Sequence, residues 1–224
     1  MKFRSLLVIF TLALIVEGFA NAFEILAIQF FSKPSLMLIL LVYFAANTKG
    51  ISARKYLIIL ALVSSWLGDI VLLIEKSFGA LFALGLTAFL IAHASYVSFF
   101  LNIGKQNLGR RQIKALPMLL VAVYSGLFYL MLFPSLSTLK IPVLIYVFVI
   151  SMMLVACIHA FDFEKHDFGW FCLAGTLLFA ASDSILAFNR FVSPIPFGGL
   201  FVITLYGIGQ LLITEGALRN LRDH

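Results

Sequence analysis

Two aspartates lie inside long apolar stretches of this sequence, where a carboxylate is costly. Asp69 lies within the run LIILALVSSWLGDIVLLIE at residues 57–75, and Asp183 lies within a second apolar run at residues 169–188. A charged side chain at the centre of a bilayer costs roughly 2.5–3.5 kcal/mol on insertion scales. Ionisable residues kept at such a cost commonly mark a functional site, so these aspartates are the first candidates for chemistry.

Two carboxyl groups that share a dry site can divide the work of acid and base. They cannot both ionise cheaply, so one stays protonated at neutral pH and can donate a proton. The other, as a carboxylate, can polarise a water molecule. Two further interpretations remain open. Each carboxyl could be bonded to a neighbouring helix for structure only, or the pair could line an ion or proton path in a transporter.

The elements that must position these aspartates are transmembrane helices. Hydrophobic residues make up 62% of the chain and charged residues only 12%, against about 25% charged in a soluble domain. The apolar runs do not alternate with period two, as the strands of a membrane barrel would. We therefore predict an all-α, polytopic membrane protein whose residues 1–224 form a single integral-membrane domain. Eight spans are expected, at residues 6–23, 34–48, 55–75, 79–103, 115–133, 140–160, 168–189 and 197–218.

The basic residues predict how these spans are oriented. Most of them gather at one set of span ends, which should face the cytoplasm, so both termini would be cytoplasmic. The first run resembles a signal peptide, but its removal would leave an odd span count, so we expect it to be retained. The formal charge of +6 therefore indicates topology rather than nucleic-acid binding. The expected cytoplasmic set is Lys2, Arg4, Lys49, Arg54, Lys55, Lys105, Arg110, Arg111, Lys114, Lys165, Arg219 and Arg222, and the opposite set is Lys33, Lys76, Lys140 and Arg190.

Both aspartates are predicted to lie at the same depth. The spans at 55–75 and 168–189 run in the same direction, and each aspartate precedes the outer end of its span by about 9 Å. A small residue precedes each one, Gly68 or Ser182, which lets another helix approach closely. The runs GDIVLL and SDSILA are alike, and Lys-Pro and Lys-Ile-Pro open the second and sixth spans. These features suggest a tandem repeat of four plus four spans.

Other polar side chains are predicted near the centre of the bundle. His93 and Tyr96 share one helical face, and Tyr206 and Gln210 share another. On this span assignment His93 and Gln210 lie deeper than the aspartates by about 10 Å. We therefore expect a polar column rather than one compact cluster.

Two charged residues near the outer ends of the first two spans have two interpretations each. Lys33 at the outer mouth could attract a lipid phosphate, or it could simply extend towards water. Glu17 could be a third member of the aspartate site or a helix-end residue. The 24 Phe residues suit both a lipid-facing surface and a pocket for acyl chains.

The order and spacing of these residues resemble the lysoplasmalogenase (YhhN) family of eight-span membrane proteins. The resemblance extends from about Lys33 to Glu215, with no departure at the aspartates. The first span and the loop at residues 161–168 contribute nothing to it. The matching positions are Lys33-Pro34, Gly68-Asp69-Ile70-Val71-Leu72-Leu73, Gly85, Ala88-Phe89, His93, Tyr96, Phe179, Ser182-Asp183-Ser184, Ala187, Tyr206 and Gln210.

This resemblance implies hydrolysis of the vinyl ether of a lysophospholipid, the lysoplasmalogen, drawn from membrane lipids. The products would be a fatty aldehyde and glycerophosphocholine or glycerophosphoethanolamine. The proposed catalytic acids of the family correspond to Asp69 and Asp183, and the reaction requires no cofactor, nucleotide or metal. In a bacterium the enzyme would lie in the plasma (inner) membrane. The candidate substrate-binding residues are Lys33, His93, Tyr96, Asn189, Tyr206 and Gln210.

Two non-enzymatic hypotheses remain beside this one. A small transporter or proton-coupled carrier could use the same aspartates to line a water-accessible path. The predicted parallel disposition of the two aspartates does not favour the inverted repeats common in carriers. A lipid-binding or scaffold protein without catalysis is the third hypothesis.

Overall fold

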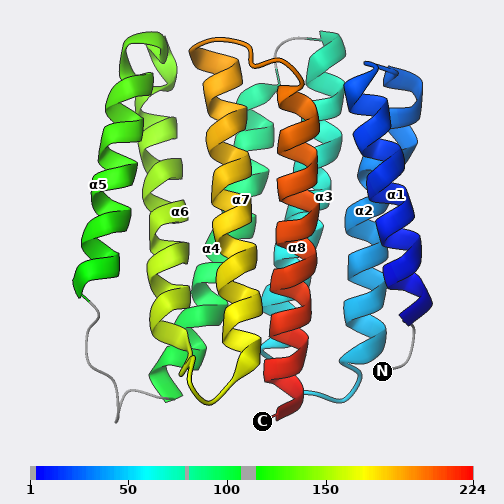
Figure 1. Cartoon of the computed structure of the whole chain (residues 1–224), viewed down its shortest axis with the longest axis vertical. Coiled ribbons are helices and arrows are strands. Elements are labelled where there is room, and N and C mark those ends of the chain that lie inside the picture. Colours follow the sequence, from blue (N-terminus) through cyan, green and yellow to red (C-terminus); the bar gives the residue numbers. More distant parts are fainter. Residues whose placement is uncertain (1–3, 79–80, 107–114, 224) are drawn as a thin grey trace.

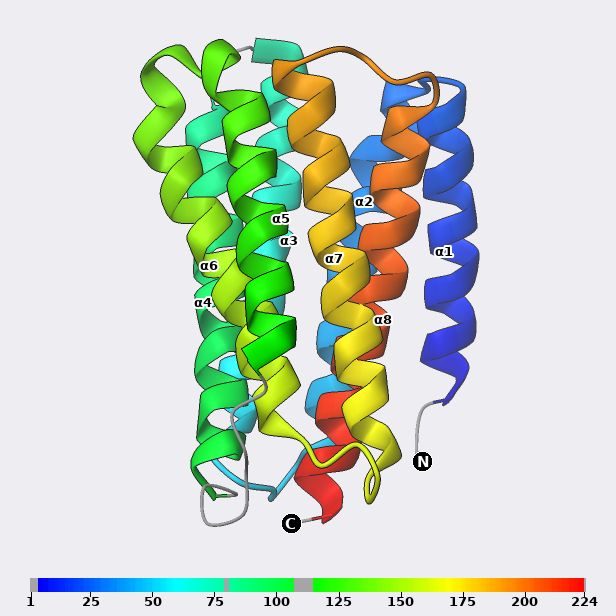
Figure 2. The same cartoon turned by 60° about the vertical axis from the view of Figure 1, so that its left-hand side comes forward.

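The computed structural model describes residues 4–78, 81–106 and 115–223, and these residues form a bundle of long helices (Figures 1 and 2). Eight of the helices in these ranges are long and apolar enough to cross a membrane. The chain is therefore an integral, multi-pass membrane protein. The helices are α1 (Arg4–Ala22), α2 (Leu26–Asn47), α3 (Lys55–Phe78), α4 (Phe82–Gln106), α5 (Ala115–Leu132), α6 (Lys140–Ala160), α7 (Asp167–Phe191) and α8 (Gly198–Asp223), with short 3-10 turns η1 (Phe133–Ser135) and η2 (Ser137–Leu139).

The helices form a ring with one helix outside it. Around the ring, α1 packs on α2, α2 on α3, α3 on α4, α4 on α6, α6 on α7, and α7 on α8, and α8 returns to α1. Helix α8 also contacts α2 and α3, while α5 packs mainly on α6 and touches α7 lightly. The α1–α2, α5–α6 and α7–α8 connections lie at one end, the upper end in Figure 1, where α3 also ends and α4 begins.

The predicted spans are confirmed as helices, but the second begins earlier than expected. Helix α2 begins at Leu26 rather than at residue 34, so Pro34 lies inside it and does not open it. The chain turns back at Glu24, which has a positive φ of 55°. The buried Gln29 amide donates to the carbonyl of Ala20 at 2.8 Å, and so pairs one of the last carbonyls of α1. The tandem repeat stays a prediction.

Both described ends of the chain lie at the lower end of the bundle (Figure 1). Arg4 begins α1 there and Asp223 ends α8 there, which agrees with the predicted even number of spans. The assignment of this end to the cytoplasm remains a prediction. Of the residues used for it, Lys2, Arg110, Arg111 and Lys114 lie outside the described residues.

Helices α7 and α8 meet backbone to backbone. A Cβ atom at Gly175 would lie 2.7 Å from the Gly209 carbonyl oxygen, and one at Gly216 would lie 2.9 Å from the Cys172 nitrogen. Real side chains do not fit at such distances, so glycine is required where these helices cross. The Ser182 hydroxyl also donates to the Val202 carbonyl at 2.9 Å. This close pair fixes the helix that carries Asp183 against the helix that carries Tyr206.

Candidate active site

Asp69 and Asp183 line the same pocket, which we call the aspartate pocket. It is partly open, with an empty volume of about 590 Å³ that includes the open part, and residues of α1, α2, α3, α4, α7 and α8 line it. Because α3 and α7 both rise towards the upper end, the two carboxyls reach it from corresponding levels. The lining residues are Asn21, Lys33, Asp69, Leu72, Phe89, Ser182, Asp183, Leu186, Asn189, Gly199, Val202, Ile203 and Tyr206.

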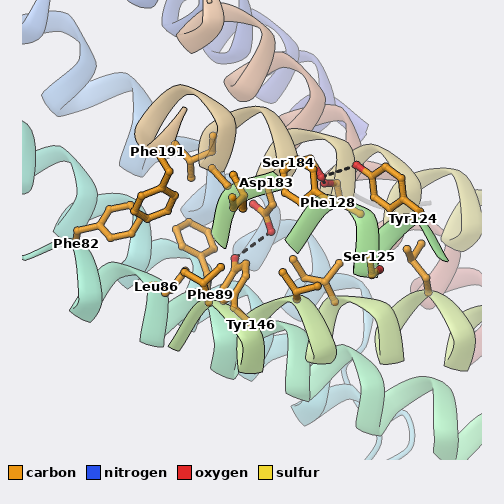
Figure 3. Close-up of a pocket in the computed structure, with 18 of the residues that line it drawn as sticks. Phe82, Leu86, Phe89, Tyr124, Ser125, Phe128, Tyr146, Asp183, Ser184 and Phe191 are labelled. Carbon is orange, nitrogen blue, oxygen red and sulfur yellow. Dashed lines mark hydrogen bonds between the residues drawn. The ribbon is translucent and has the colours of Figure 1, made fainter. Parts of the chain in front are cut away.

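Asp183 on α7 is 9% exposed and lies between an imidazole and a phenol. The Tyr146 hydroxyl of α6 donates to Asp183 Oδ2 at 3.0 Å (Figure 3). His93 Nε2 of α4 lies 3.2 Å from the same oxygen, although the contact is not aligned as a hydrogen bond. The other ring nitrogen, Nδ1, lies 2.7 Å from the Phe89 carbonyl oxygen. A carbonyl only accepts, so Nδ1 carries a hydrogen and Nε2 is the ring position open to Asp183.

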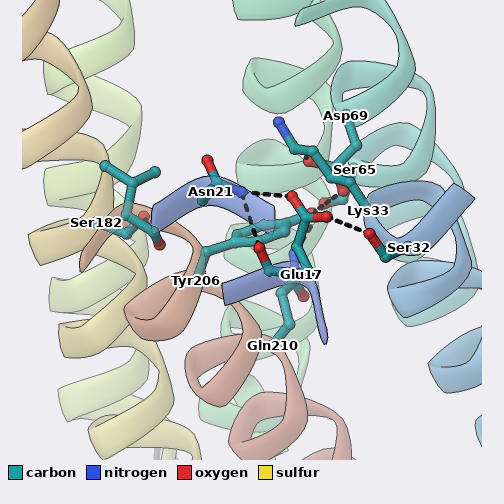
Figure 4. Close-up of polar contacts among 10 residues, drawn as sticks. Glu17, Asn21, Ser32, Lys33, Ser65, Asp69, Ser182, Tyr206 and Gln210 are labelled. Atoms are coloured by element: carbon teal, nitrogen blue, oxygen red, sulfur yellow. Dashed lines mark hydrogen bonds and ion pairs between the residues drawn. The ribbon is translucent and has the colours of Figure 1, made fainter. Parts of the chain in front are cut away.

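Asp69 on α3 is 1% exposed and is held by two different groups. The Tyr206 hydroxyl of α8 donates to Asp69 Oδ2 at 2.8 Å, and Lys33 Nζ of α2 lies 3.6 Å from Oδ1 (Figure 4). The Lys33 side chain is 16% exposed. Its ammonium group therefore faces a carboxylate inside the bundle and stabilises the negative form of Asp69.

The prediction that His93 lies about 10 Å below the aspartates is wrong. Helix α4 begins at Phe82 and α7 ends at Phe191, so the two Cα atoms differ in depth by only about one helical turn. Helical side chains lean towards the N-terminus of their own helix. His93 on the descending α4 therefore leans upward and Asp183 on the ascending α7 leans downward. The two side chains meet in one cluster.

Tyr96 and Gln210 form a second polar layer that does not line the aspartate pocket. The Tyr96 hydroxyl donates to Gln210 Oε1 at 2.5 Å, and Gln210 Nε2 donates to Ser65 Oγ at 2.9 Å. Ser65 and Gln210 each lie one turn below the pocket residues Asp69 and Tyr206 on the same helices. This layer joins α3, α4 and α8 beneath the pocket. Gln210 is thus deeper than Asp69, as predicted, but by about one turn.

Asn189 lines the pocket near the upper end and also holds the loop above it. Its Oδ1 atom accepts a hydrogen bond from the Ile195 backbone N–H at 2.7 Å. Its amide also packs directly against Gly198, at the first residue of α8. Asn189 therefore connects the pocket wall to the α7–α8 turn.

Glu17 is fully buried on α1 beside the same site. Its two carboxylate oxygens accept from Asn21 Nδ2 at 2.6 Å and from Ser32 Oγ at 2.5 Å (Figure 4). Asn21 lines the aspartate pocket, and Ser32 is next to Lys33 in the chain. Glu17 lies more than one turn before the end of α1 at Ala22, so it is not a helix-end residue. Its hydrogen bond to Asn21 holds part of the pocket wall.

Sequence reasoning missed three residues that shape the site. Asn21 and Ser182 line the pocket, and Tyr146 donates to Asp183. The available signal for Tyr146 was a hydroxyl in the middle of a strongly apolar span, which needs a partner when it is buried. Within the described residues, no three His, Cys, Asp or Glu side chains converge in a way that could hold a metal ion.

Comparison with known proteins gives a consistent set of relatives. Residues 28–217 match the YhhN family. The chain is 31% identical over 167 residues to human "Lysoplasmalogenase TMEM86A", covering 73% of this chain and 65% of that protein. It is 32% identical over 161 residues to human "Lysoplasmalogenase TMEM86B", covering 71% and 62%. It is 29% identical over 195 residues to the mouse "Lysoplasmalogenase TMEM86B", covering 86% and 77%.

The matches to the two human proteins thus span slightly less than two thirds of their length. Helix α1, which carries Glu17 and Asn21, lies before the segment that matches the family. No solved structure matches the chain.

Proposed function

The chain belongs to the YhhN family, and we propose that it hydrolyses the vinyl ether bond of lysoplasmalogens. The relatives named lysoplasmalogenase support this reaction. The observation that carries the proposal is that Asp69 and Asp183, more than a hundred residues apart in the chain, line one pocket. The substrate is a lysophospholipid taken from the surrounding membrane lipids.

The reaction needs one proton donor and one water molecule. A proton adds to the β-carbon of the vinyl ether, which leaves an oxocarbenium ion at the carbon bonded to oxygen. Water adds to that carbon and loses a proton, giving a hemiacetal. The hemiacetal hydroxyl then loses its proton as the bond to the glycerol oxygen breaks, and the glycerol oxygen takes up a proton. The products are a fatty aldehyde and glycerophosphocholine or glycerophosphoethanolamine.

Asp183 is suited to supply the proton. With Nδ1–H of His93 committed to the Phe89 carbonyl, Nε2 is the ring atom that faces Asp183 Oδ2, at 3.2 Å. The Tyr146 hydroxyl holds the same oxygen in position.

Asp69 is suited to act as the carboxylate. The ammonium of Lys33 and the hydroxyl of Tyr206 both stabilise negative charge on it. A carboxylate in the pocket attracts the positive oxocarbenium ion and can accept the proton of the attacking water. The two aspartates thus take different roles because their neighbours differ.

The transporter hypothesis is not favoured. The relatives are named as enzymes, and the bonded layer of Tyr96, Gln210 and Ser65 occupies the space beneath the aspartate pocket.

An aldehyde-release assay tests the proposed reaction. Purified protein in detergent is given an alkenyl lysophospholipid, and the aldehyde is measured beside the matching saturated ether, which cannot form an oxocarbenium ion by protonation. We expect aldehyde from the alkenyl lipid only. Asp69→Asn and Asp183→Asn should each reduce the rate by about 100- to 10,000-fold, the usual contribution of general acid–base catalysis.

The matched control is Asp167→Asn, which makes the same change at an exposed position on the helix that carries Asp183. This variant should keep its activity. Near-normal turnover in both pocket variants, with all proteins folded and monodisperse, would remove the proposed mechanism.

A further inference from the structure

A second pocket lies on the other side of α7 from the aspartate pocket, and we call it the apolar pocket (Figure 3). It is partly open, with an empty volume of about 760 Å³ that includes the open part, and lies between α7 and the helices α4, α5 and α6. Its walls are mostly aliphatic and aromatic, including Leu86, Phe128, Val147 and Ile150. A pocket of this size and character suits an apolar ligand.

The polar groups that line the apolar pocket are bonded to one another. Tyr124 donates to Ser184 at 2.9 Å, and the Ser125 and Ser151 hydroxyls lie 2.7 Å apart. Tyr146 donates to Asp183, which is the pocket's one lining carboxyl. The hydroxyl groups of the wall therefore already have hydrogen-bond partners. A hydrocarbon can lie against them at little cost in desolvation free energy.

The two pockets meet at Asp183. Leu72, Phe89, Asp183 and Leu186 line both of them, whereas Asp69 and Lys33 line only the aspartate pocket. A ligand with a polar head and a hydrocarbon chain could occupy both pockets and pass Asp183 at their junction.

The apolar pocket is long as well as wide. Its lining residues extend from Val143 to Leu154 on α6 and from Ala180 to Phe191 on α7. Each stretch covers about 16 Å at the rise of an α-helix. Its lower part, around Ile150 and Leu154, points towards the middle of the bundle and away from the upper end.

We infer that the apolar pocket binds the hydrocarbon chain of the substrate, with the chain end towards Ile150 and the polar head in the aspartate pocket. This rests on the proposed function. The glycerol side of the vinyl ether then faces Asp69, and the β-carbon, on the chain side, faces Asp183. The arrangement agrees with Asp183 as proton donor, because it is the aspartate that reaches both pockets.

The hydrocarbon chain of the lipid can reach this pocket from the side of the bundle. Helix α5 packs on α6 and touches α7 lightly, and Tyr124, 52% exposed, joins α5 to α7 through Ser184. A lipid in the bilayer can enter between these helices without leaving its apolar surroundings. In the bilayer, the hydrocarbon chain is already surrounded by lipid tails. Its transfer into the pocket therefore gains little free energy from the hydrophobic effect, and the pocket selects chains by length and shape.

Filling the lower end of the pocket tests this assignment. Ile150→Trp should reduce turnover of long-chain substrate by about tenfold or more, the usual discrimination of a hydrophobic pocket that no longer fits. Turnover of a short-chain substrate should stay nearly unchanged. The matched control is Ile145→Trp, which places the same side chain on the lipid-facing side of the same helix, where Ile145 is 47% exposed. The control should keep the original chain-length profile.

Two further measurements keep the result decisive. Ile150→Ala enlarges the pocket and should shift the preferred chain length upward. This variant provides the test if Ile150→Trp does not fold. Saturated-ether lysophospholipids of graded chain length, detected bound to the protein by native mass spectrometry, should show the same shifts without any hydrolysis.

If the protein did not hydrolyse the substrate, the dependence of binding on chain length could therefore still be measured. An unchanged profile in all Ile150 variants, or an equal loss at every chain length, would overturn the chain assignment.

Discussion

Two regions of this bundle hold buried carboxyl groups beside tyrosine hydroxyls, and the basic partners of these groups differ. Near the upper half, Asp69 and Asp183 line the aspartate pocket. Near the lower end, Glu215 on α8 is 7% exposed and lines neither pocket. All three accept a hydrogen bond from a tyrosine hydroxyl, which for Glu215 is Tyr43 at 2.8 Å.

The difference lies in the distance to the basic partner. Arg219 Nε donates to Glu215 Oε1 at 2.9 Å, a charge-assisted hydrogen bond of ordinary length. In the pocket, Lys33 Nζ is 3.6 Å from Asp69 and His93 Nε2 is 3.2 Å from Asp183. Burial and a tyrosine partner therefore do not by themselves indicate a reactive carboxyl. We expect a carboxyl that faces a pocket and has a more distant basic partner to be the reactive kind.

The largest expected contrast comes from moving a carboxyl by one methylene in each region. Asp183→Glu should lower kcat by about 100-fold, because a displacement of about 1 Å disrupts proton transfer even though the pocket has room for the longer side chain. Glu215→Asp should leave the rate of aldehyde release nearly unchanged and lower thermal stability. Initial rates and unfolding midpoints of both variants check this. Equal rate losses would abolish the distinction between the regions.

The next contrast removes a tyrosine hydroxyl from each region. Tyr206→Phe should slow aldehyde release by about tenfold or more, since a hydrogen bond to a charged group contributes about 1.5–3 kcal/mol. Tyr43→Phe removes the corresponding bond from Glu215 and should act on stability alone. Steady-state kinetics beside thermal unfolding separates the two results. A rate loss in Tyr43→Phe as large as in Tyr206→Phe would contradict the separation.

A smaller effect is expected when the lower carboxylate loses its charge. Glu215→Gln can still accept from Tyr43 but no longer attracts Arg219, whose side chain is 44% exposed. Water screens part of that attraction, so the expected loss is about 1–2 kcal/mol of unfolding free energy. The unfolding midpoint in detergent measures it. Loss of activity in a fully folded variant would show that Glu215 belongs with the reactive pair.

The smallest effect is expected for an ion pair at the upper end. Arg190 donates to Glu75 at 2.7 Å and lies over the Phe82 ring at 5.0 Å, but its side chain is 45% exposed. Arg190→Lys keeps a cation beside the buried Glu75 and should therefore cost less than about 1 kcal/mol of unfolding free energy, and aldehyde release should persist. Parallel stability and rate measurements check both expectations. A strong rate loss would extend the reactive region to this pair.

The helices and the shared level of the aspartates could be predicted from the sequence, because both follow from apolar run length and a fixed rise per residue. The start of α2 could not. Gln29 and Ser32 are polar and Pro34 resembles a boundary, so the segment before residue 34 did not read as a span. In the structure, Gln29 and Ser32 are both satisfied by α1.

The partners within the site were also beyond the sequence. Periodicity places His93 on a helix face but does not give the lean of its side chain relative to Asp183, which closes the gap between them. The sequence alone does not distinguish Tyr146 from any other buried aromatic residue. The partner of its hydroxyl is known only once the neighbouring helix is known. Contacts between helices that are distant in the chain need the tertiary arrangement.

The glycine crossing of α7 and α8 has a consequence for turnover. Because their backbones are in direct contact at Gly175 and Gly209, we expect these two helices to move together as a unit. We expect the slow motions to occur in α5 instead, which packs mainly on α6. If the proposed reaction holds, we expect the aldehyde to leave sideways between the helices that line the apolar pocket and the glycerophosphoester to leave from the aspartate pocket.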